Sequence, residues 1–349
     1  MSWQLIVSGI KVLAKKILAI YYNLHNPPLI NLINSNVLAW PGFMGFKGGI
    51  YNPGAISLDG EIILLARAER FGEKDRQDRT KYLRSCSPLL FRYSNSMVLK
   101  ESKVVSLENY PINNFLRAHD FRLFKFKAFI FVNHTLTDTS SWIDSTFAKW
   151  ENMEENVTIG ELDLKRCCLK FRGTPKLDFM LKRREKNFGF FEHNDNLYLV
   201  YSFSPYILLE ALNLEKLHFR TVINKEIRLD SLNTNDDTLV SLSTNPIHYD
   251  DKYYFMLVHK KDRFYVYAHW GIMISKESLL PTKITSRPLF RGNTSKGALT
   301  SIVYVMSVLS CGDRLRFFLG EGDLYTSYVE ITKRDLDEVF ITISSESIL

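Results

Sequence analysis

The stretch RAHDFRLFKFKAFIFVNHT, residues 117–135, joins a group of acid-base side chains to a run with strand character. Its second half is rich in aromatic and β-branched residues, which is typical of a strand that enters a hairpin. His119, Asp120 and Arg122 stand directly before that run. A carboxylate two residues from an arginine is held ionised and oriented by its charge, as a proton-transfer or hydroxyl-binding group requires. A surface ion pair without function is the alternative.

Composition indicates a folded protein with an affinity for anions. The 349 residues are 46% hydrophobic and 24% charged, enough for one large core or two modest ones. The net charge of +7 and the pI near 9.0 favour an anionic membrane surface, a nucleotide-linked donor or nucleic acid as neighbour. No C-x-x-C pair is present, so we expect reduced thiols in a cytoplasmic protein.

The first 28 residues differ from the rest of the chain. Apolar residues recur at helical spacing over residues 2–25, while Lys11, Lys15 and Lys16 interrupt them. Three lysines argue against a spanning helix, and no secretory cleavage site follows. We expect an amphipathic helix over residues 1–28 that lies peripherally on the inner face of the membrane. The alternative is a helix packed on the protein's own body.

From residue 37 onward, short apolar runs alternate with turn signals and recur about every 50–70 residues. Such recurrence predicts an all-β, five-bladed propeller over residues 38–345. The expected blades span residues 38–85, 86–140, 160–225, 238–292 and 297–345, with 141–159 as a polar insertion. A two-sheet sandwich is the alternative, although the chain is long for one.

The order of motifs adds a family resemblance. YNPGAISLDGEIILLARAE, residues 51–69, resembles the first-blade segment of the β-mannoside phosphorylases, which are inverting five-bladed propeller enzymes. Asp120 and Arg122 fall where those enzymes carry Glu-Asp-Pro-Arg, whose aspartate is the catalytic acid. Residues 185–206, 245–275 and 312–331 are similar, in the same order, to segments of the later blades.

The chain also resembles the related β-1,2-mannosyltransferases. His119 and Phe121 replace the glutamate and proline of the phosphorylase acid motif, and the arginine-rich third-blade motif is missing. Arg172, Lys186 and His259 could hold inorganic phosphate or, equally, the diphosphate of a sugar nucleotide.

The resemblance implies that Asp120 is the catalytic residue. It implies a substrate-binding role for Asn52, Arg67, Glu69, His119, Arg122, Lys186, Asn187, Tyr201, His259, Tyr265, Tyr267 and Asp323. Each has a structural alternative: a solvated cross-strand pair for Arg67 with Glu69, a solvated turn for Lys186 with Asn187, and a core group for His259. Tyrosines on strands usually pack, and Asp323 follows turn-forming glycines.

Three functions are therefore open. The first is an inverting glycosyltransferase that adds a β-linked mannose, or a similar hexose, from a nucleotide-sugar donor to a glycan acceptor in cell-surface polysaccharide synthesis. The second is a β-mannoside phosphorylase that releases mannose 1-phosphate. The third is a non-catalytic carbohydrate-binding propeller.

The expected donor is GDP-mannose, and no nucleic-acid partner, cofactor or metal is expected. The only D-x-D pair, Asp335 with Asp337, lies far from any nucleotide-binding motif, and there is no Gly-rich phosphate loop.

Overall fold

The computed structural model describes residues 27–32, 35–71, 86–111, 116–138, 154–229, 232, 240–261, 266–292, 296 and 302–349. Within these ranges the chain is almost entirely β-structure, and its strands form five separate sheets. The predicted helix over residues 1–28 falls almost wholly on residues 1–26, which lie outside the described ranges. Among the described helices, none is long and apolar enough to cross a membrane.

Three sheets consist of strands that are close together in the chain, and each begins with its innermost strand. Sheet I contains β2 (Gly49–Leu58), β3 (Glu61–Glu69), β4 (Cys86–Ser94) and β5 (Leu99–Val104). Sheet II contains β7 (Leu116–Phe126), β8 (Phe129–Asp138), β9 (Glu154–Asp163), β10 (Cys168–Gly173) and β6 (Ser106–Glu108). Sheet III contains β11 (Gly189–His193), β12 (Asn196–Phe203), β13 (Tyr206–Asn213) and β14 (His218–Lys225).

The remaining two sheets contain strands from both ends of the chain. Sheet IV contains β15 (Val240–Leu242), β16 (Ile247–His248), β17 (Tyr253–Lys261), β18 (Tyr267–Ser275), β19 (Pro281–Thr285), β20 (Phe290–Arg291) and β24 (Phe340–Thr342). Sheet V contains β21 (Val303–Cys311), β22 (Arg314–Glu321), β23 (Tyr325–Thr332) and β1 (Asn36–Ala39). Thus β1 completes the sheet of the last long strands, while β24 joins β19 in the sheet before it.

Turn chemistry explains the tight connections between successive strands. Asn194 and Asp195 join β11 to β12, and both have positive φ. Two such residues in a two-residue loop are the signature of a type I′ turn, whose twist matches that of the flanking strands. Asp59 and Gly60, also with positive φ, make the equivalent connection between β2 and β3. The polar turn signals of the sequence therefore close hairpins inside the sheets.

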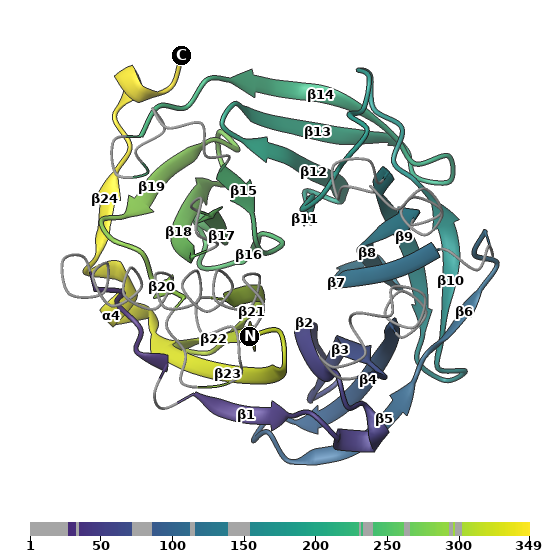
Figure 1. Ribbon diagram of the computed structural model, residues 1–349. Coiled ribbons are helices and arrows are strands. Elements are labelled where there is room, and N and C mark those ends of the chain that lie inside the picture. The colour runs from purple at the N-terminus through teal and green to yellow at the C-terminus, as the bar shows by residue number, and fades with distance from the viewer. Residues whose placement is uncertain are drawn as a thin grey trace, which may run out of the picture.

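Apolar side chains fill the spaces between neighbouring sheets. Five buried clusters each draw their members from two sheets: I with II, II with III, III with IV, IV with V, and V with I. The sheets therefore follow one another in a closed ring around a central axis (Figure 1). The predicted all-β, propeller-like arrangement is confirmed, and the sandwich alternative is wrong because five sheets, rather than two, share the core.

The innermost strands β2 and β7 advance together along the axis, since Asn52 lies beside Asp120 and Gly54 beside Phe121 and Arg122. Cross-links place them in register: the Ser307 hydroxyl donates to the Pro53 carbonyl (2.9 Å), and the Asn245 amide donates to the Leu123 carbonyl (3.1 Å). The end of the axis at which β2, β7, β11 and β21 begin is called the entry end. The opposite end, where hairpin turns connect these strands to the strands that follow them, is called the hairpin end.

The predicted limits of the first three blades are wrong. Strands β4 and β5, residues 86–104, belong with β2, and strands β9 and β10, residues 154–173, belong with β7. The predicted insertion 141–159 overlaps β9 at residues 154–159, where Val157 and Ile159 are buried, and residues 141–153 lie outside the described ranges. A polar segment marks a connection, but it does not show whether that connection lies within one sheet or between two.

Candidate active site

Two neighbouring inner strands bulge at the entry end. The pairing of β7 with β8 shifts between His119 and Arg122, and the pairing of β2 with β3 shifts between Tyr51 and Gly54. Asp120 and Asn52, the bulged residues, have φ values of 59° and 53°. A bulge re-aims the side chain that it carries. The Asn52 amide thus donates to Oδ1 of Asp120 over 3.1 Å.

The close approach of these strands needs a glycine. A Cβ at Gly54 would lie 2.3 Å from the backbone oxygen of Phe121 and 3.0 Å from the Cα of Arg122. Any other residue would therefore push β2 away from β7 and separate Asn52 from Asp120. The Asn-Pro-Gly motif of the sequence is thus explained by packing between two sheets as well as by its place in the bulge.

His119 holds the other oxygen of the carboxylate. Its Nδ1 lies 2.9 Å from Oδ2 of Asp120, and its Nε2 lies 2.9 Å from the hydroxyl of Thr137. Burial lowers the pKa of His119 to about 4, so the ring is neutral at pH 7. We therefore assign the proton to Nδ1, which donates to Asp120, while Nε2 accepts from Thr137.

The carboxyl of Asp120 is ionised at neutral pH. Burial by itself would raise its pKa, but His119, Arg67 and Lys186 together outweigh burial and hold the pKa well below its ordinary value. The side chain nevertheless remains 18% exposed, so a substrate can reach it. The entry end thus presents a fixed, accessible carboxylate. The contact between His119 and Asp120 could be expected from the sequence, because the two residues are adjacent. Asn52, which lies in another sheet, was identified as a site residue only through the family motif.

Arg67 and Glu69 belong to a buried ion-pair network beside this carboxylate. The Arg67 Nε donates to the Glu69 carboxylate over 2.7 Å, and Arg117 and Tyr51 donate to the same oxygen. The Arg67 guanidinium also lies over the Tyr51 ring, 4.8 Å from its centroid. Glu69 is buried, which rules out the solvated-pair alternative. Arg117 was missed, although it opens the stretch that holds Asp120.

Arg122 does not orient Asp120, so that part of the prediction is wrong. Its guanidinium donates to the Ser243 carbonyl (2.8 Å), to Asn187 Oδ1 (2.9 Å) and to the Tyr304 hydroxyl (2.9 Å). The bulge breaks the two-residue alternation that would otherwise put Asp120 and Arg122 on one face. Arg122 instead ties sheet II to residues of sheets III, IV and V. Tyr304, in an apolar strand, gave no signal in the sequence.

Lys186, Asn187 and Tyr201 line a cavity of about 550 Å³ between sheets II, III and IV. The Lys186 amine pairs with the buried Glu155 over 2.7 Å, and Arg184 pairs with its other oxygen over 2.6 Å. The Tyr201 hydroxyl donates to Glu185 over 2.8 Å. Burial, followed by the charges of Lys186 and Arg184, lowers the pKa of Lys261, so these cations lie close together.

His259 and Tyr267 lie deeper in sheet IV. His259 is buried, its Nδ1 lies 2.9 Å from the Ser243 hydroxyl, and its ring centroid is 5.0 Å from that of Tyr304 and 5.6 Å from that of Tyr267. Burial, together with His269 and Arg122, holds its pKa well below the ordinary value. It therefore meets the description of a satisfied core histidine, which is linked to Arg122 through Ser243 and Tyr304.

The other predicted residues are not joined to Asp120 by these contacts. Asp323 lies at positive φ in the turn between β22 and β23, as its turn alternative predicts. Arg172 lies on β10, a peripheral strand of sheet II, where it pairs with Glu161, so it is not one of the cations of the site. Tyr265 lies outside the described residues.

No metal centre is found among the described residues, because no three His, Cys, Asp or Glu side chains gather suitably. The D-x-D pair has structural partners: Asp335 bonds Thr332 at the start of helix α4 (Lys333–Asp337), and Asp337 accepts from Tyr249.

Comparison with solved structures finds the same fold in proteins that are described as acting on mannosides. The chain is similar to the β-1,2-mannobiose phosphorylase from Listeria innocua, with a TM-score of 0.60, 15% identity, and coverage of 88% of this chain and 99% of the other. It is also similar to a structure described under the GH130 family of mannoside phosphorylases, which contains glycoside hydrolases that target β-1,2 mannosidic linkages in Candida mannan. That TM-score is 0.58, with 13% identity and coverage of 88% and 92%.

A third similar structure is MPT-1, a GDP-Man-dependent mannosyltransferase from Leishmania mexicana. Here the TM-score is 0.57, with 10% identity and coverage of 90% of this chain and 93% of the other. No family model and no curated protein matches the sequence. The expected resemblance to the mannoside phosphorylases and mannosyltransferases is thus confirmed, and at these identities it is a likeness of fold.

Proposed function

We propose that the protein is an inverting glycosyltransferase that adds a β-linked mannose, or a similar hexose, from a nucleotide-sugar donor to a glycan acceptor. In this proposal the five sheets are the blades of one propeller, and the reaction takes place at its entry end. The observation that carries the proposal is the fixed, ionised carboxylate of Asp120, held by Asn52 and His119.

The reaction is a single displacement at the anomeric carbon. The acceptor hydroxyl oxygen forms a bond to this carbon, and the bond from the carbon to the donor's phosphate oxygen breaks. The nucleoside diphosphate leaves with the electron pair, and Asp120 takes the acceptor proton, directly or through a substrate hydroxyl. One displacement on an α-linked donor gives a β-linked product.

The protonation state of Asp120 favours this direction of reaction. A general base must be ionised before the reaction, whereas a general acid must carry a proton. The pKa of Asp120 lies well below its ordinary value, so at pH 7 the carboxyl is ionised, as a general base must be. A phosphorylase acid would instead need a raised pKa, or a substrate that raises it on binding.

The cations beside the 550 Å³ cavity suit the donor. Lys182, Arg184 and Lys186 line the cavity with two carboxylates, Glu155 and Glu185, so positive charge is in excess. Lys186 also lies close enough to Asp120 to lower its pKa. A diphosphate is held well by several charge-assisted bonds of this kind. We assign this cavity to the diphosphate of a donor such as GDP-mannose.

The second candidate is a β-mannoside phosphorylase that uses the same carboxylate in the reverse direction. The observation in its favour is the fold similarity to the phosphorylase from Listeria innocua, which spans 99% of that chain. Here Asp120 would deliver a proton to the glycosidic oxygen, and phosphate would form the bond to the anomeric carbon and yield mannose 1-phosphate.

A matched set of assays tests the two candidates. Purified protein is incubated with GDP-mannose and a short mannoside acceptor, and separately with β-1,2-mannobiose and inorganic phosphate. Release of GDP with growth of the acceptor is expected only in the first assay. Phosphate-dependent formation of mannose 1-phosphate without GDP-mannose turnover would establish the phosphorylase instead. Activity in neither, combined with binding of the mannoside, would leave a carbohydrate-binding propeller.

We also propose a peripheral location on the cytoplasmic face of the membrane, in cell-surface polysaccharide synthesis. The support is the amphipathic pattern of residues 2–25 with Lys11, Lys15 and Lys16. Deletion of residues 1–25 should abolish binding to anionic vesicles and leave the unfolding transition unchanged. Loss of folding on deletion would show that this segment packs on the body of the protein.

A further inference from the structure

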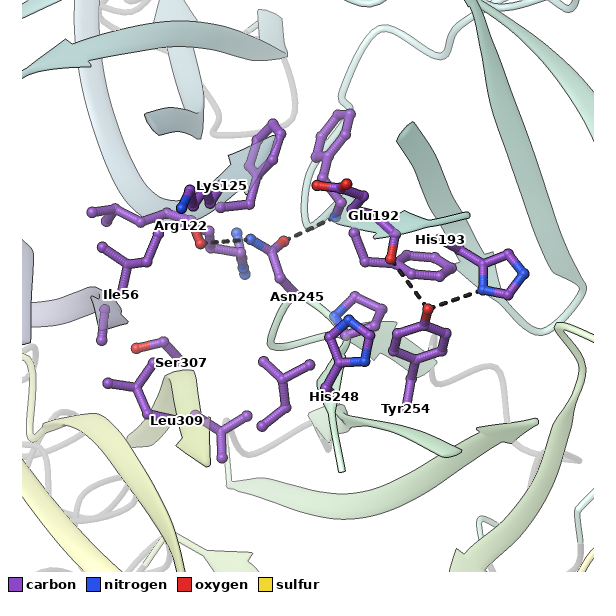
Figure 2. A pocket seen from close by; sticks show the side chains of 18 of the residues that line it. Ile56, Arg122, Lys125, Glu192, His193, Asn245, His248, Tyr254, Ser307 and Leu309 are labelled. Carbon is purple, nitrogen blue, oxygen red and sulfur yellow. Dashed lines mark hydrogen bonds between the residues drawn. The ribbon is translucent and has the colours of Figure 1, made fainter. Parts of the chain in front are cut away.

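A second and larger cavity, of about 1040 Å³, opens at the hairpin end of the ring (Figure 2). Its walls come from later positions on the inner strands than those of the candidate active site: Ile56 on β2, Lys125 on β7, His193 on β11, His248 on β16 and Leu309 on β21. Asp120 and its partners Asn52 and His119 do not line it, whereas Arg122, which bonds Asn187 and Tyr304, does. It is therefore a separate compartment at the opposite end of the axis.

A layer of bonded side chains separates the two compartments. The amide of Asn245 donates to the Leu123 carbonyl (3.1 Å) and its oxygen accepts from the Phe190 backbone (3.0 Å), which joins three sheets. The Arg122 guanidinium is bound on the entry side of this layer, to Asn187 and Tyr304. Asn245 bonds through both its oxygen and its nitrogen, and Arg122 bonds through Nε and Nη2, so we expect the layer to be fixed in place.

The cavity combines an apolar wall with an aromatic one. Ile56 and Leu309 lie on one side in Figure 2, and His193, Tyr254 and His248 lie together on the other. The Tyr254 hydroxyl lies 2.9 Å from Nδ1 of His193, and its ring is 4.9 Å from the ring of His248. Flat rings beside aliphatic groups give C–H faces of a ligand a surface on which to pack.

Charges of both signs surround this interior. The lining includes three lysines and four carboxylates: Lys125, Lys127, Lys276, Glu192, Asp195, Asp251 and Glu277. Within the described part of the chain, the side chains of Lys125, Asp251 and Glu277 make no hydrogen bond or ion pair, and all three are exposed. They are thus available to a ligand at little cost in folding.

The balance of charge indicates the chemical class of that ligand. The four carboxylates would repel a polyanion, and the three lysines would repel a polycation, so neither class of ligand is favoured. A neutral polyol can accept hydrogen bonds from the amines and donate to the carboxylates. Its ring C–H groups can cover the imidazoles and aliphatic side chains. The volume is at the upper end for small-molecule sites, which suits several linked units.

We propose that the hairpin end carries a second, non-catalytic saccharide site that binds a neutral oligosaccharide segment. This proposal rests on the lining of the cavity and not on the transferase proposed above. The site holds a glycan chain at the end of the axis opposite to Asp120. In this arrangement the protein contacts carbohydrate at both ends of the axis. The reaction takes place at the entry end, and the glycan chain is held at the hairpin end.

Photoaffinity labelling of the full chain tests this site. The probe is a neutral linear mannotetraose with a diazirine at its reducing end, used without sugar nucleotide or phosphate. Labelled peptides are expected to include residues 190–195, 246–251 or 306–309, in addition to any at the entry end. Saturable labelling there that an excess of unlabelled mannotetraose displaces would establish the site. Labelling confined to entry-end peptides would overturn it.

Two variants sharpen the result. Lys125→Ala with Glu277→Ala, and separately His248→Ala, should each lower hairpin-end labelling about five- to tenfold, as expected for one or two lost hydrogen bonds or a lost packing surface. The matched control is Glu215→Ala with Lys216→Ala, an exposed pair in the turn between β13 and β14. Equal labelling of variants and control, or displacement of the probe by a sulfated tetrasaccharide but not by mannotetraose, would contradict a neutral saccharide site.

Discussion

The two ends of the central axis are built from the same strands but on different principles. At the entry end the charges beside Asp120 are bonded inside the protein: Glu69 with two arginines, Asp120 with Asn52 and His119. At the hairpin end the charges of Lys125 and Glu277 are exposed and have no partner among the described residues. The first arrangement fixes atoms in advance of a reaction, and the second leaves groups free to adapt to a ligand.

Strain follows the same division. Asn52, Asp120 and Asn187 all have positive φ at the entry end. A non-glycine residue in this region costs free energy, which the surrounding bonds must outweigh. At the hairpin end, positive φ is confined to turn residues such as Asn194 and Asp195, where it is the normal geometry of the loop. The comparison shows that a site whose reacting groups must be held in fixed positions needs hydrogen bonds from several sheets. A site that only binds a glycan chain needs only an accessible surface.

The largest expected difference between the ends is in catalysis. Asp120→Asn should lower the transfer rate by about a hundred- to ten-thousandfold, because the amide keeps the volume but cannot accept the proton. The hairpin-end counterpart, Asp251→Asn, should leave the rate unchanged. Initial rates with GDP-mannose and a short mannoside acceptor measure both. Full turnover by Asp120→Asn would remove the proposed mechanism and that of the phosphorylase alternative.

The next largest difference is in stability. Glu69→Gln should lower the free energy of unfolding by about 3–5 kcal/mol, because Arg117 and Arg67 lose the carboxylate that compensates their buried charge. Glu277→Gln, at the hairpin end, should change it by less than about 0.5 kcal/mol. Urea unfolding of the two variants beside the wild type measures both changes. Similar values for both would mean that the ion-pair network contributes no net stability.

Acid should destabilise the protein through its buried histidines. Burial lowers the pKa of His119 and His134 to about 4 and that of His269 to about 3, below the unfolded value of about 6.5. The unfolded chain therefore binds protons that the folded chain does not, and stability, complete above pH 6.5, falls as the pH drops toward 4. We expect a loss of about 2 kcal/mol per histidine between pH 7 and pH 5.

This loss should depend on which histidine is replaced. His134→Gln should reduce the loss of unfolding free energy between pH 7 and pH 5 by about 2 kcal/mol, the amount expected for one buried histidine. His193→Gln should have a smaller effect, since His193 is only partly buried and its pKa is lowered less severely. Urea unfolding at pH 7 and pH 5 measures both variants. A wild-type stability that is equal at the two pH values would contradict the buried, neutral state of these rings.

Donor binding should show a smaller effect. Lys186→Ala should raise the KM for the nucleotide sugar about tenfold through the loss of one charge-assisted bond. The change in kcat should be smaller, because Lys186 only assists in keeping Asp120 ionised. Lys127→Ala at the hairpin end is the matched control, and its KM should match that of the wild type. A kcat effect larger than the KM effect would move Lys186 from the donor to the reacting atoms.

The smallest expected effect tests the separation of the two ends. Lys125→Ala with Glu277→Ala should change the transfer rate to a disaccharide acceptor by less than about twofold, because the Arg122 and Asn245 layer lies between these residues and Asp120. Steady-state rates with a short acceptor measure this. A large loss of activity would mean that the two compartments communicate.

The sequence was sufficient to predict an all-β ring and the importance of Asp120, because both depend on local information. Apolar runs separated by turn residues predict strands and hairpins wherever they occur. The order of the motifs identified Asn52 and Lys186 as candidate site residues. Asn52 donates a hydrogen bond to Asp120, and the charge of Lys186 lowers the pKa of Asp120. The limits of the first sheets could not be predicted, since a polar loop looks the same within a sheet and between two.

Only the tertiary structure decided the partners of each charged group. Asp120 and Arg122, two residues apart, point to different neighbours because a bulge between them breaks the alternation of the strand. Arg122 bonds Tyr304, 182 positions away, which no local pattern indicates. The sequence by itself thus determined which residue types and which strands are available. Their pairing depends on how five sheets close into a ring, and that closure is set by packing between segments that are distant in the chain.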